Sequence, residues 1–319
     1  MKAAVYDRTG PPEVFRYADV PDPECGPGEV LVEVEVISVE GGDTLNRAGG
    51  EMATRPHIVG YQCAGTVREV GAGVADRSVG DRVVCTMLWG SHAELVATPA
   101  NLTWRIPESL DTPSAACVPI AWGTADDCLF EFGHLAAGET VLVQAGAGGI
   151  GLAAIQLAKR AGATVLATAS SDDKLERLRD YGLDHGINYR AVDFAAAARE
   201  LTGGRGVDLV VDSVGSTLGG SIRSLAYRGR CTLVGHAGRD TQPFDASSLM
   251  GGNLTLTGVL FALEIFNARA SAMVARHLDD IAAGKLRVVI DRTFPLAEAA
   301  AAHAYLESRQ AFGRVVLVP

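Results

Sequence analysis

The sequence feature that most constrains the fold is a run of glycines between an apolar strand and an apolar helix. Residues 146–151 read Gly-Ala-Gly-Gly-Ile-Gly, with glycine in the first, third and sixth places. They follow an expected strand at 140–145, and an expected helix over 150–161 begins inside the run. In such a turn the first glycine permits the bend, the second lets a ligand approach the backbone, and the third lets helix and strand pack closely.

The start of a helix presents unpaired N–H groups and a positive dipole end, and both favour an anion. The run therefore predicts a loop that binds the pyrophosphate of a dinucleotide. The alternative is a glycine-rich turn without a ligand. Because the chain holds 37 glycines in 319 residues, the pattern alone is weak, and the strand and helix on either side give it weight.

Apolar strands and helices alternate after about residue 121. Besides the strand before the glycines, strands are expected at 163–169, 185–189, 207–212, 230–235 and 254–260. A helix is expected at 172–181, and Gly162 is placed to end the helix before it. Apolar strands that alternate with helices predict a doubly wound α/β unit whose parallel sheet is covered on both faces.

The first 120 residues predict a β-rich unit instead. Residues 29–39 alternate acidic and apolar side chains, as a half-buried strand does, and shorter strands are expected at 64–70, 81–87 and 92–97. The C-terminal segment predicts helices at 268–283 and 295–308 and strands near 288–290 and 313–318. It is too small for a core of its own, so we expect it to complete the N-terminal unit. The expected domains are 1–120 with 266–319, and a dinucleotide-binding domain at 121–265 inserted between them.

The strand after the glycine run bears on the choice between NAD and NADP. A site for NAD usually carries Asp or Glu at the end of this strand, where it binds the ribose 2′-hydroxyl. Here the strand ends in Ser170 and Ser171, and the cationic Lys174 follows one helical turn later. Asp172 and Asp173 are expected to cap the next helix. Hydroxyls and a cation suit a 2′-phosphate, so the pattern favours NADPH over NADH.

Composition excludes several classes of partner and location. The formal net charge is −10 and no basic run is present, which argues against nucleic acid. The longest apolar stretch, 145–155, is too short and glycine-rich to span a membrane, and the N-terminus lacks an apolar signal core. The six cysteines form no CxxC pair, which favours free thiols in a reducing compartment. We therefore expect a cytoplasmic protein.

Several segments resemble the medium-chain dehydrogenase/reductase superfamily, and together they cover essentially the whole chain. They are the glycine run itself and residues 80–83, 90–96, 138–143, 187–190, 207–215 and 312–319. None of the seven tyrosines has a lysine four residues later, the pair that short-chain dehydrogenases use. The chain is most similar to the zinc-independent quinone oxidoreductases and related enoyl reductases. This resemblance implies a GroES-like β-rich catalytic domain beside a Rossmann domain.

The same resemblance bears on zinc. Zinc alcohol dehydrogenases carry a cysteine before a Gly-x-Asp-type turn, a Gly-His-Glu segment and a lobe of four cysteines. The corresponding places here read Glu40-Gly41-Gly42-Asp43 and Gly60-Tyr61-Gln62-Cys63, and the cysteine lobe is missing. A catalytic zinc needs three protein donors. Glu40 and Cys63 could supply two and no third is evident, so we expect no metal.

The resemblance also implies cofactor contacts. Thr124 stands where the family binds the nicotinamide carboxamide, and Lys174 and Tyr189 stand where quinone reductases bind the adenosine 2′-phosphate; Tyr189 could also pack under the adenine. The full expected set is Thr124, Gly146, Ala147, Gly148, Gly149, Ile150, Gly151, Ser170, Ser171, Lys174, Tyr189, Ser213, Gly215, Gly235, Phe261 and Arg314.

The substrate side departs from the family. Its first active-site loop usually reads Val-Asn-Pro/Phe-x-Asp-Thr-Tyr-x-Arg, and here Glu40 replaces the asparagine and Leu45 the tyrosine. The candidate proton donors are Glu40, Asp43, Tyr61 and His92. For Tyr61 and His92 a packing role is an equal alternative.

Without a metal to polarise a simple ketone, the expected reaction is hydride transfer from NADPH to a quinone or an α,β-unsaturated carbonyl, which disperses its own charge. One alternative is an NADPH-binding structural or regulatory protein with little turnover, and another is a zinc-type alcohol dehydrogenase. Residues 254–260 could form an edge strand that pairs with a second copy, so a homodimer is expected.

Overall fold

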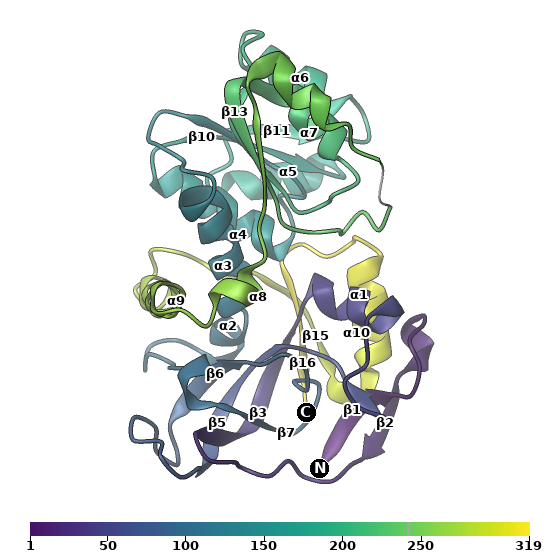
Figure 1. The fold of residues 1–319 in the computed structure, drawn as a ribbon, viewed down its shortest axis with the longest axis vertical. Coiled ribbons are helices and arrows are strands. Elements are labelled where there is room, and N and C mark those ends of the chain that lie inside the picture. Colours follow the sequence, from purple (N-terminus) through teal and green to yellow (C-terminus); the bar gives the residue numbers. More distant parts are fainter. Residues whose placement is uncertain (241–242) are drawn as a thin grey trace. The chain divides into compact units, whose positions relative to one another are not determined.

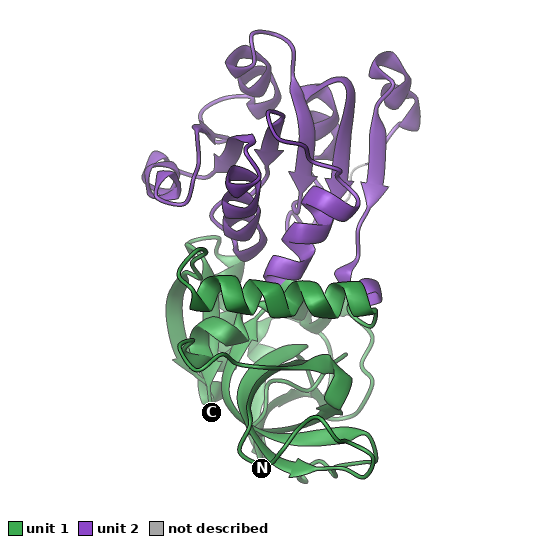
Figure 2. Cartoon of the chain, turned by 90° about the vertical axis from the view of Figure 1, so that its left-hand side faces the viewer, with its two compact units in different colours: residues 1–120, 265–319 green, residues 121–264 purple. Residues whose placement is uncertain are grey.

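The structure is a computed structural model that describes residues 1–240 and 243–319. The chain divides into two compact units, Met1–Ile120 with Ile265–Pro319 and Ala121–Glu264 (Figure 2). None of the helices formed by the described residues combines the length and the apolar character that a membrane span requires.

Unit 2 is built on a parallel sheet whose strands run in the order β11-β10-β9-β12-β13-β14 within the described residues. Every neighbouring pair in it is parallel, as predicted. Counted from β9, this order is 3-2-1-4-5-6, the order of a Rossmann fold, in which the strand sequence reverses between β9 and β12. The strands are β9 (Thr140–Val143), β10 (Thr164–Ala169), β11 (His185–Asn188), β12 (Val207–Asp212), β13 (Leu225–Leu233) and β14 (Thr255–Gly258).

Helices pack against this sheet and bury its central strands (Figure 1). Helix α4 contacts β9 and β10, and α7 contacts β12 and β13. All four residues of β9 are buried, which explains why the strand reads as a continuous apolar run. Gly162 ends α4 with a φ of 84°, as predicted. The helices are α3 (Pro119–Asp126), α4 (Gly149–Arg160), α5 (Asp172–Arg179), α6 (Phe194–Leu201), α7 (Leu218–Ser224) and α8 (Phe261–Glu264), with the helical turns η3 (Asp127–Glu131) and η4 (Ala246–Gly252).

Unit 1 is organised around the long strand β3 (Glu29–Val39), which has the bounds that the sequence predicts. Glu33 and Glu35 are exposed while the valines between and beside them are buried, so the alternation reflects one covered face. β3 pairs antiparallel with β5, β7 and the C-terminal strand β16. The remaining strands are β1 (Lys2–Tyr6), β2 (Arg16–Asp19), β4 (His57–Ile58), β5 (Gln62–Val70), β6 (Arg82–Thr86), β7 (Leu95–Pro99), β8 (Thr103–Arg105), β15 (Ile290–Pro295) and β16 (Arg314–Val318).

Some boundaries differ from the sequence-based expectations. The strand expected from residue 92 begins at Leu95, because Ala93 already bridges Ala3 outside β7. The helix expected from 295 begins at Ala299, because Pro295 is the last residue of β15 and a 3-10 turn follows it. The helical elements of unit 1 are η1 (Pro12–Val14), α1 (Gly41–Gly49), η2 (Ala100–Leu102), α2 (Thr112–Ala116), α9 (Ala268–Ala282), η5 (Leu296–Glu298) and α10 (Ala299–Glu307).

Candidate functional site

The glycine run forms the turn between β9 and α4, and its three key glycines have different surroundings. A Cβ atom at Gly146 would lie 2.8 Å from the Cβ of Ala167, and one at Gly151 would lie 2.4 Å from the carbonyl oxygen of Ala145. At Gly148 the nearest atom would be 3.3 Å away. The first and third glycines are therefore required by close packing, whereas a Cβ at the second would meet a single atom, the carbonyl oxygen of Ala145, and leaves room on its other sides for a phosphate.

The first N–H groups of α4 begin at the same place. Gly148 is the N-cap of α4, and no side chain caps the helix there. Ala147 and Ile150 flank the two glycines at this end. The first N–H groups of an α-helix have no partner within the helix, so they point at whatever binds beyond its start. The loop thus has the features of an anion site at a helix N-terminus.

Three further predicted cofactor residues come together in the segments that follow β12 and β13. A Cβ at Gly215 would lie 2.7 Å from the carbonyl oxygen of Gly235, and a Cβ at Gly235 would lie 2.6 Å from that of Ser213. The Ser213 hydroxyl donates to the carbonyl oxygen of Gln144, at 3.5 Å. At 215 and 235 these backbone segments are close enough that only glycine fits, and the bond from Ser213 ties the first of them to the end of β9.

The residues predicted to bind a 2′-phosphate lie at one corner, at the ends of β10 and β11. Ser171 is the N-cap of α5, because its hydroxyl oxygen accepts the N–H of Lys174 at 3.4 Å. The Tyr189 N–H donates to the carbonyl oxygen of Ala169, directly before Ser170, at 3.2 Å. The side chain of Tyr189 is partly exposed, so its ring is accessible.

The expectation that Asp172 and Asp173 cap the helix is wrong, since Ser171 has that role. Asp172 instead accepts a hydrogen bond from the side-chain amide of Asn188, at 3.0 Å. Its carboxylate therefore ties α5 to the end of β11.

Thr124 and Phe261 lie on helices that meet. Thr124 is buried in α3. A Cβ on the neighbouring Gly123 would lie 2.3 Å from the ring of Phe261, so the aromatic ring packs directly on the backbone of α3. Glycine is needed at 123 for this approach, and the sequence analysis did not single it out.

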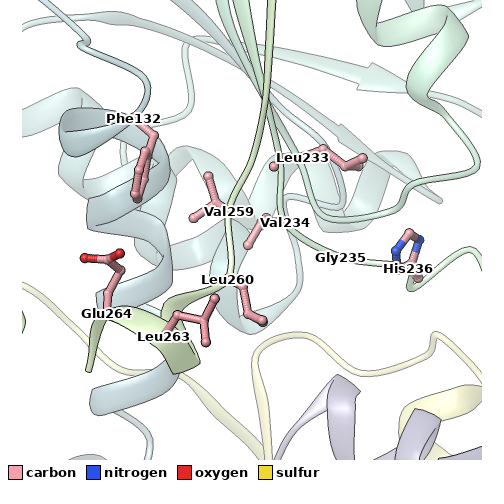
Figure 3. Close-up of a pocket in the computed structure, with 10 residues that line it drawn as sticks. Phe132, Leu233, Val234, Gly235, His236, Val259, Leu260, Leu263 and Glu264 are labelled. Atoms are coloured by element: carbon pink, nitrogen blue, oxygen red, sulfur yellow. The ribbon is translucent and has the colours of Figure 1, made fainter. Parts of the chain in front are cut away.

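An apolar groove of about 560 Å³ opens at the ends of β13 and β14, next to Gly235 (Figure 3). Leu260 and Leu263 project into it and are mostly exposed, at 60% and 74%. His236 and Glu264 are its charged or polar members. The lining residues are Phe132, Leu233, Val234, Gly235, His236, Gly258, Val259, Leu260, Leu263 and Glu264. Apart from Gly235, none of these residues was predicted from the sequence as part of a site. The apolar residues Val259 and Leu260, directly after β14, are the signal that could have indicated the groove.

In unit 1 the structure brings together two residues that were predicted for different roles. Glu40 and Arg314 are both buried and form an ion pair. The guanidinium of Arg314 also donates to the hydroxyl of Ser38, at 2.6 Å, and to the carbonyl oxygen of Val39, at 3.2 Å. Gln62 donates its side-chain amide to Glu40. This arrangement favours Arg314 as the partner of Glu40 rather than as a cofactor contact.

Asp43 and Tyr61 lie at the start of α1. Asp43 is fully buried and accepts the N–H of Glu40, at 2.8 Å, and burial raises the pKa of its carboxyl well above the usual value. Tyr61 is half-buried, and a Cβ at Gly42 would lie 2.4 Å from its hydroxyl oxygen. Burial, and then the nearby Asp43, raise the pKa of Tyr61 well above its usual value, although a backbone hydrogen bond from Gly42 acts in the opposite direction. Tyr61 therefore keeps its proton at neutral pH and has an accessible edge.

His92 lies in the core. Its side chain is fully buried, and its Nε2 lies 3.1 Å from Nε2 of His303. Its ring stacks parallel to that of Phe15, with 6.3 Å between the ring centres. Burial lowers the pKa of His92 to about 3, so the imidazole is neutral. We assign His92 a packing role and do not keep it among the proposed proton donors.

Within residues 1–240 and 243–319, no three His, Cys, Asp or Glu side chains converge in a way that could hold a metal ion. The two side chains that the sequence analysis weighed as zinc donors are otherwise engaged. Glu40 pairs with Arg314, and the Sγ of Cys63 lies 3.4 Å from that of Cys85 on the neighbouring strand. The hydrogen bond to Cys85, together with burial, raises the pKa of the Cys63 thiol well above its usual value.

Comparison with known protein families matches a part of each unit to a dehydrogenase family. Residues 26–108 match the profile of the alcohol dehydrogenase GroES-like domain, and residues 149–279 match that of the zinc-binding dehydrogenases. A 2-haloacrylate reductase from a Burkholderia species is 37% identical, over 100% of this chain and 99% of that protein.

Two solved structures are similar over the full length of this chain and of their own. A mycobacterial protein complexed with NADPH has a TM-score of 0.95 at 37% identity. The Escherichia coli quinone oxidoreductase complexed with NADPH has a TM-score of 0.96 at 28% identity.

The burial of His92 predicts a dependence of stability on pH. A histidine in the unfolded chain has a pKa of about 6.5, against about 3 for His92 in the fold, so the unfolded state binds the proton more tightly. This contribution to stability is complete above about pH 6.5 and is lost as the pH falls toward 3, by up to about 1.4 kcal/mol per pH unit. His92→Asn should therefore reduce the loss of unfolding free energy between pH 6.5 and pH 5, measured by urea denaturation.

The exposed His185 provides the control, because His185→Asn also removes one histidine but leaves the buried His92 and its contribution to the slope in place. If His92→Asn shows the same slope as the wild type, the buried neutral state of His92 is wrong.

Proposed function

The chain belongs to the medium-chain dehydrogenase/reductase superfamily, and we propose that it reduces quinones or α,β-unsaturated carbonyls with NADPH, as quinone oxidoreductases and enoyl reductases do. The observation that carries this proposal is the turn at 146–151, where packing requires Gly146 and Gly151 while Gly148, at the head of α4, is the least crowded of the three. This turn lies beside the reversal of strand order, where Rossmann domains bind dinucleotides. The two NADPH-bound relatives support the same cofactor.

We assign the cofactor contacts as follows. The turn from Gly146 to Gly151 holds the pyrophosphate, and Ser170, Ser171, Lys174 and Tyr189 receive the adenosine 2′-phosphate. The segments at Ser213, Gly215 and Gly235, with Thr124 and Phe261, form the place for the nicotinamide half. When bound, NADPH supplies the hydride, and these residues orient it.

The substrate is a small molecule, and the apolar groove beside Gly235 supports an acceptor with a flat or apolar body. Residues 1–120 with 266–319 are the proposed substrate domain and 121–265 the proposed dinucleotide domain. Hydride addition to a conjugated carbonyl leaves negative charge on the acceptor, which a proton must then neutralise.

We propose Tyr61 as the proton donor. Among the four predicted donors it alone combines a retained proton with a partly open position, because Asp43 and His92 are fully buried and Glu40 is paired with Arg314. Tyr61 lies at the N-terminal end of α1, where its hydroxyl oxygen approaches Gly42. It thereby takes the place of the tyrosine that the family carries where this chain has Leu45.

A homodimer and a cytoplasmic location belong to the same proposal. β14 is the last strand of its sheet, so its outer edge is free to pair with a second copy. Tyr227 and Met250, near that edge, are 72% and 79% exposed. The six cysteines are free thiols, which supports a reducing compartment.

Turnover with NADPH tests the proposed function. The purified chain should oxidise NADPH with 1,4-benzoquinone and with an α,β-unsaturated ketone, but not with the corresponding saturated ketone. Lys174→Ala should raise KM for NADPH by about 10-fold or more, because a charge-assisted contact to the phosphate is lost, and should leave KM for NADH unchanged.

Arg177→Ala removes another exposed cation from α5 and should behave like the wild type. Tight binding of NADPH without turnover on any acceptor would contradict the reductase and favour a binding protein. An unchanged KM for NADPH in Lys174→Ala would contradict the assignment of the 2′-phosphate site.

The role of Tyr61 has its own test. Tyr61→Phe keeps the ring and removes the proton, so kcat with the unsaturated ketone should fall by about 100-fold while the Kd for NADPH stays the same. Tyr17→Phe, at an exposed position in β2, should keep the wild-type kcat. A kcat for Tyr61→Phe within twofold of the wild type would show that the proton comes from elsewhere.

A further inference from the structure

Four polar side chains are buried together in the otherwise apolar core of unit 2. Gln144 directly follows the apolar strand β9, and Asp212 is the last residue of the apolar strand β12. Thr168 lies in β10, and Ser221 lies in α7. Each is at most 2% exposed. A buried polar group is costly unless it is hydrogen-bonded, so the partners of these four side chains indicate why they are there.

The four side chains form one continuous chain of hydrogen bonds. The N–H of Ala145 donates to Oγ1 of Thr168, at 3.1 Å, and the Thr168 hydroxyl donates to Oε1 of Gln144, at 2.7 Å. The Gln144 amide donates to Oγ of Ser221, at 3.2 Å, and the Ser221 hydroxyl donates to Oδ2 of Asp212, at 2.7 Å.

The two ends of this chain of hydrogen bonds determine the direction in which every member donates. A backbone N–H can only donate, and a carboxylate can only accept. Each hydroxyl between them has one hydrogen, which it passes on after accepting from the group before it. Hydrogen bonds aligned in this way polarise one another in a low-dielectric interior, so the loss of one link weakens the others.

The acceptor end organises the loop after β12. Besides the Ser221 hydroxyl, the Asp212 carboxylate accepts the N–H groups of Val214 and Gly215, both at 2.9 Å, and the hydroxyl of Thr217, at 3.1 Å. This loop contains Ser213 and Gly215, which are assigned to the cofactor.

The donor end organises the pyrophosphate turn. Ala145 has a φ of 52°, in the left-handed region that an L-residue adopts only at a cost in energy. Thr168 holds this conformation from both sides, because its hydroxyl oxygen accepts the N–H of Ala145 and its carbonyl oxygen accepts the N–H of Gly146, at 2.8 Å. The carbonyl oxygen of Ala145 in turn accepts the N–H of Gly148, at 2.9 Å. The position of Gly148 therefore depends on Thr168.

We propose that Thr168, Gln144, Ser221 and Asp212 are positioning residues for the cofactor, which couple the shape of the pyrophosphate turn to that of the loop after β12. None of the four needs to touch the cofactor. The inference rests on the proposed binding of NADPH at 146–151. It predicts that a change at Ser221, three hydrogen bonds away from Ala145, weakens binding at the turn.

The test compares two threonine-to-valine substitutions in different strands of one sheet, β10 and β13. Thr168→Val removes the hydroxyl at nearly constant shape and should raise the Kd for NADPH, measured by isothermal titration calorimetry, by about 10-fold or more. Thr168→Ser should restore binding. Thr232→Val makes the same exchange at a buried position in β13, where the hydroxyl donates to the carbonyl oxygen of Val210 within the sheet and takes no part in the chain of hydrogen bonds, and should leave the Kd unchanged.

Ser221→Ala supplies a second readout that does not depend on how Thr168→Val folds. It should raise the Kd for NADPH by about 3-fold or more and leave KM for the acceptor unchanged at saturating NADPH. If Ser221→Ala, or a folded Thr168→Val, binds NADPH as tightly as the wild type, the positioning role is wrong while the proposed function stands. If the wild type itself does not bind NADPH, both are wrong.

Discussion

Close packing of α4 on the strands beside it is the constraint on which unit 2 depends. A side chain at Gly151 would collide with the carbonyl oxygen of Ala145, and one at Gly146 would collide with β10. Because the helix starts this close to the sheet, its first N–H groups point into the space beyond β9. The parallel strand order then places the ends of β9 and β12 side by side, so two loops face the same space. The polar chain from Ala145 to Asp212 joins those loops from below the surface.

Unit 1 depends on a different interaction, a buried ion pair between Glu40 and Arg314. The C-terminal strand β16 pairs with the end of β3 and thereby brings Arg314 next to Glu40. The removal of either partner from a buried ion pair leaves an uncompensated charge, which is expensive. Glu40 in turn accepts from Gln62, whose side-chain oxygen accepts the N–H of Ile120, at 3.1 Å. The loop before α1, strand β5, which begins directly after Tyr61, and the C-terminal strand are thus held by one polar cluster.

The elements with clear local patterns could be predicted from the sequence, and those that depend on distant partners could not. The alternation along β3 and the apolar runs of β9 and β12 reflect how each strand is covered, and both patterns are local. Helix α1 was not predicted, because it contains Gly41, Gly42 and Gly49, which have low helix propensity. The hydrogen bond from the N–H of Glu40 to the side chain of Asp43 helps this helix to begin.

The same distinction holds for the site. The glycine turn carries its own signal, since packing and ligand approach act on neighbouring residues. The pairing of Glu40 with Arg314 joins residues 274 positions apart, and the burial of His92 depends on His303 and Phe15. Gln144 and Asp212 gave a visible signal, as polar residues at the ends of apolar strands. The hydrogen bonds that link these two side chains form only in the fold, where β9 and β12 lie next to each other.

The most direct test of the account is the affinity of Gly148→Ala for NADPH. The backbone at Gly148 has a φ of −85°, which alanine adopts readily, and the new Cβ would meet one atom, the carbonyl oxygen of Ala145 at 3.3 Å, so a small shift of the turn lets the variant fold. Its methyl group would occupy the side from which the pyrophosphate approaches, and binding by calorimetry should weaken by about 100-fold, or about 2.7 kcal/mol. Gly251→Ala, where a Cβ meets nothing within 4 Å, should bind as the wild type does. Wild-type affinity in Gly148→Ala would contradict the assignment of this turn to the cofactor.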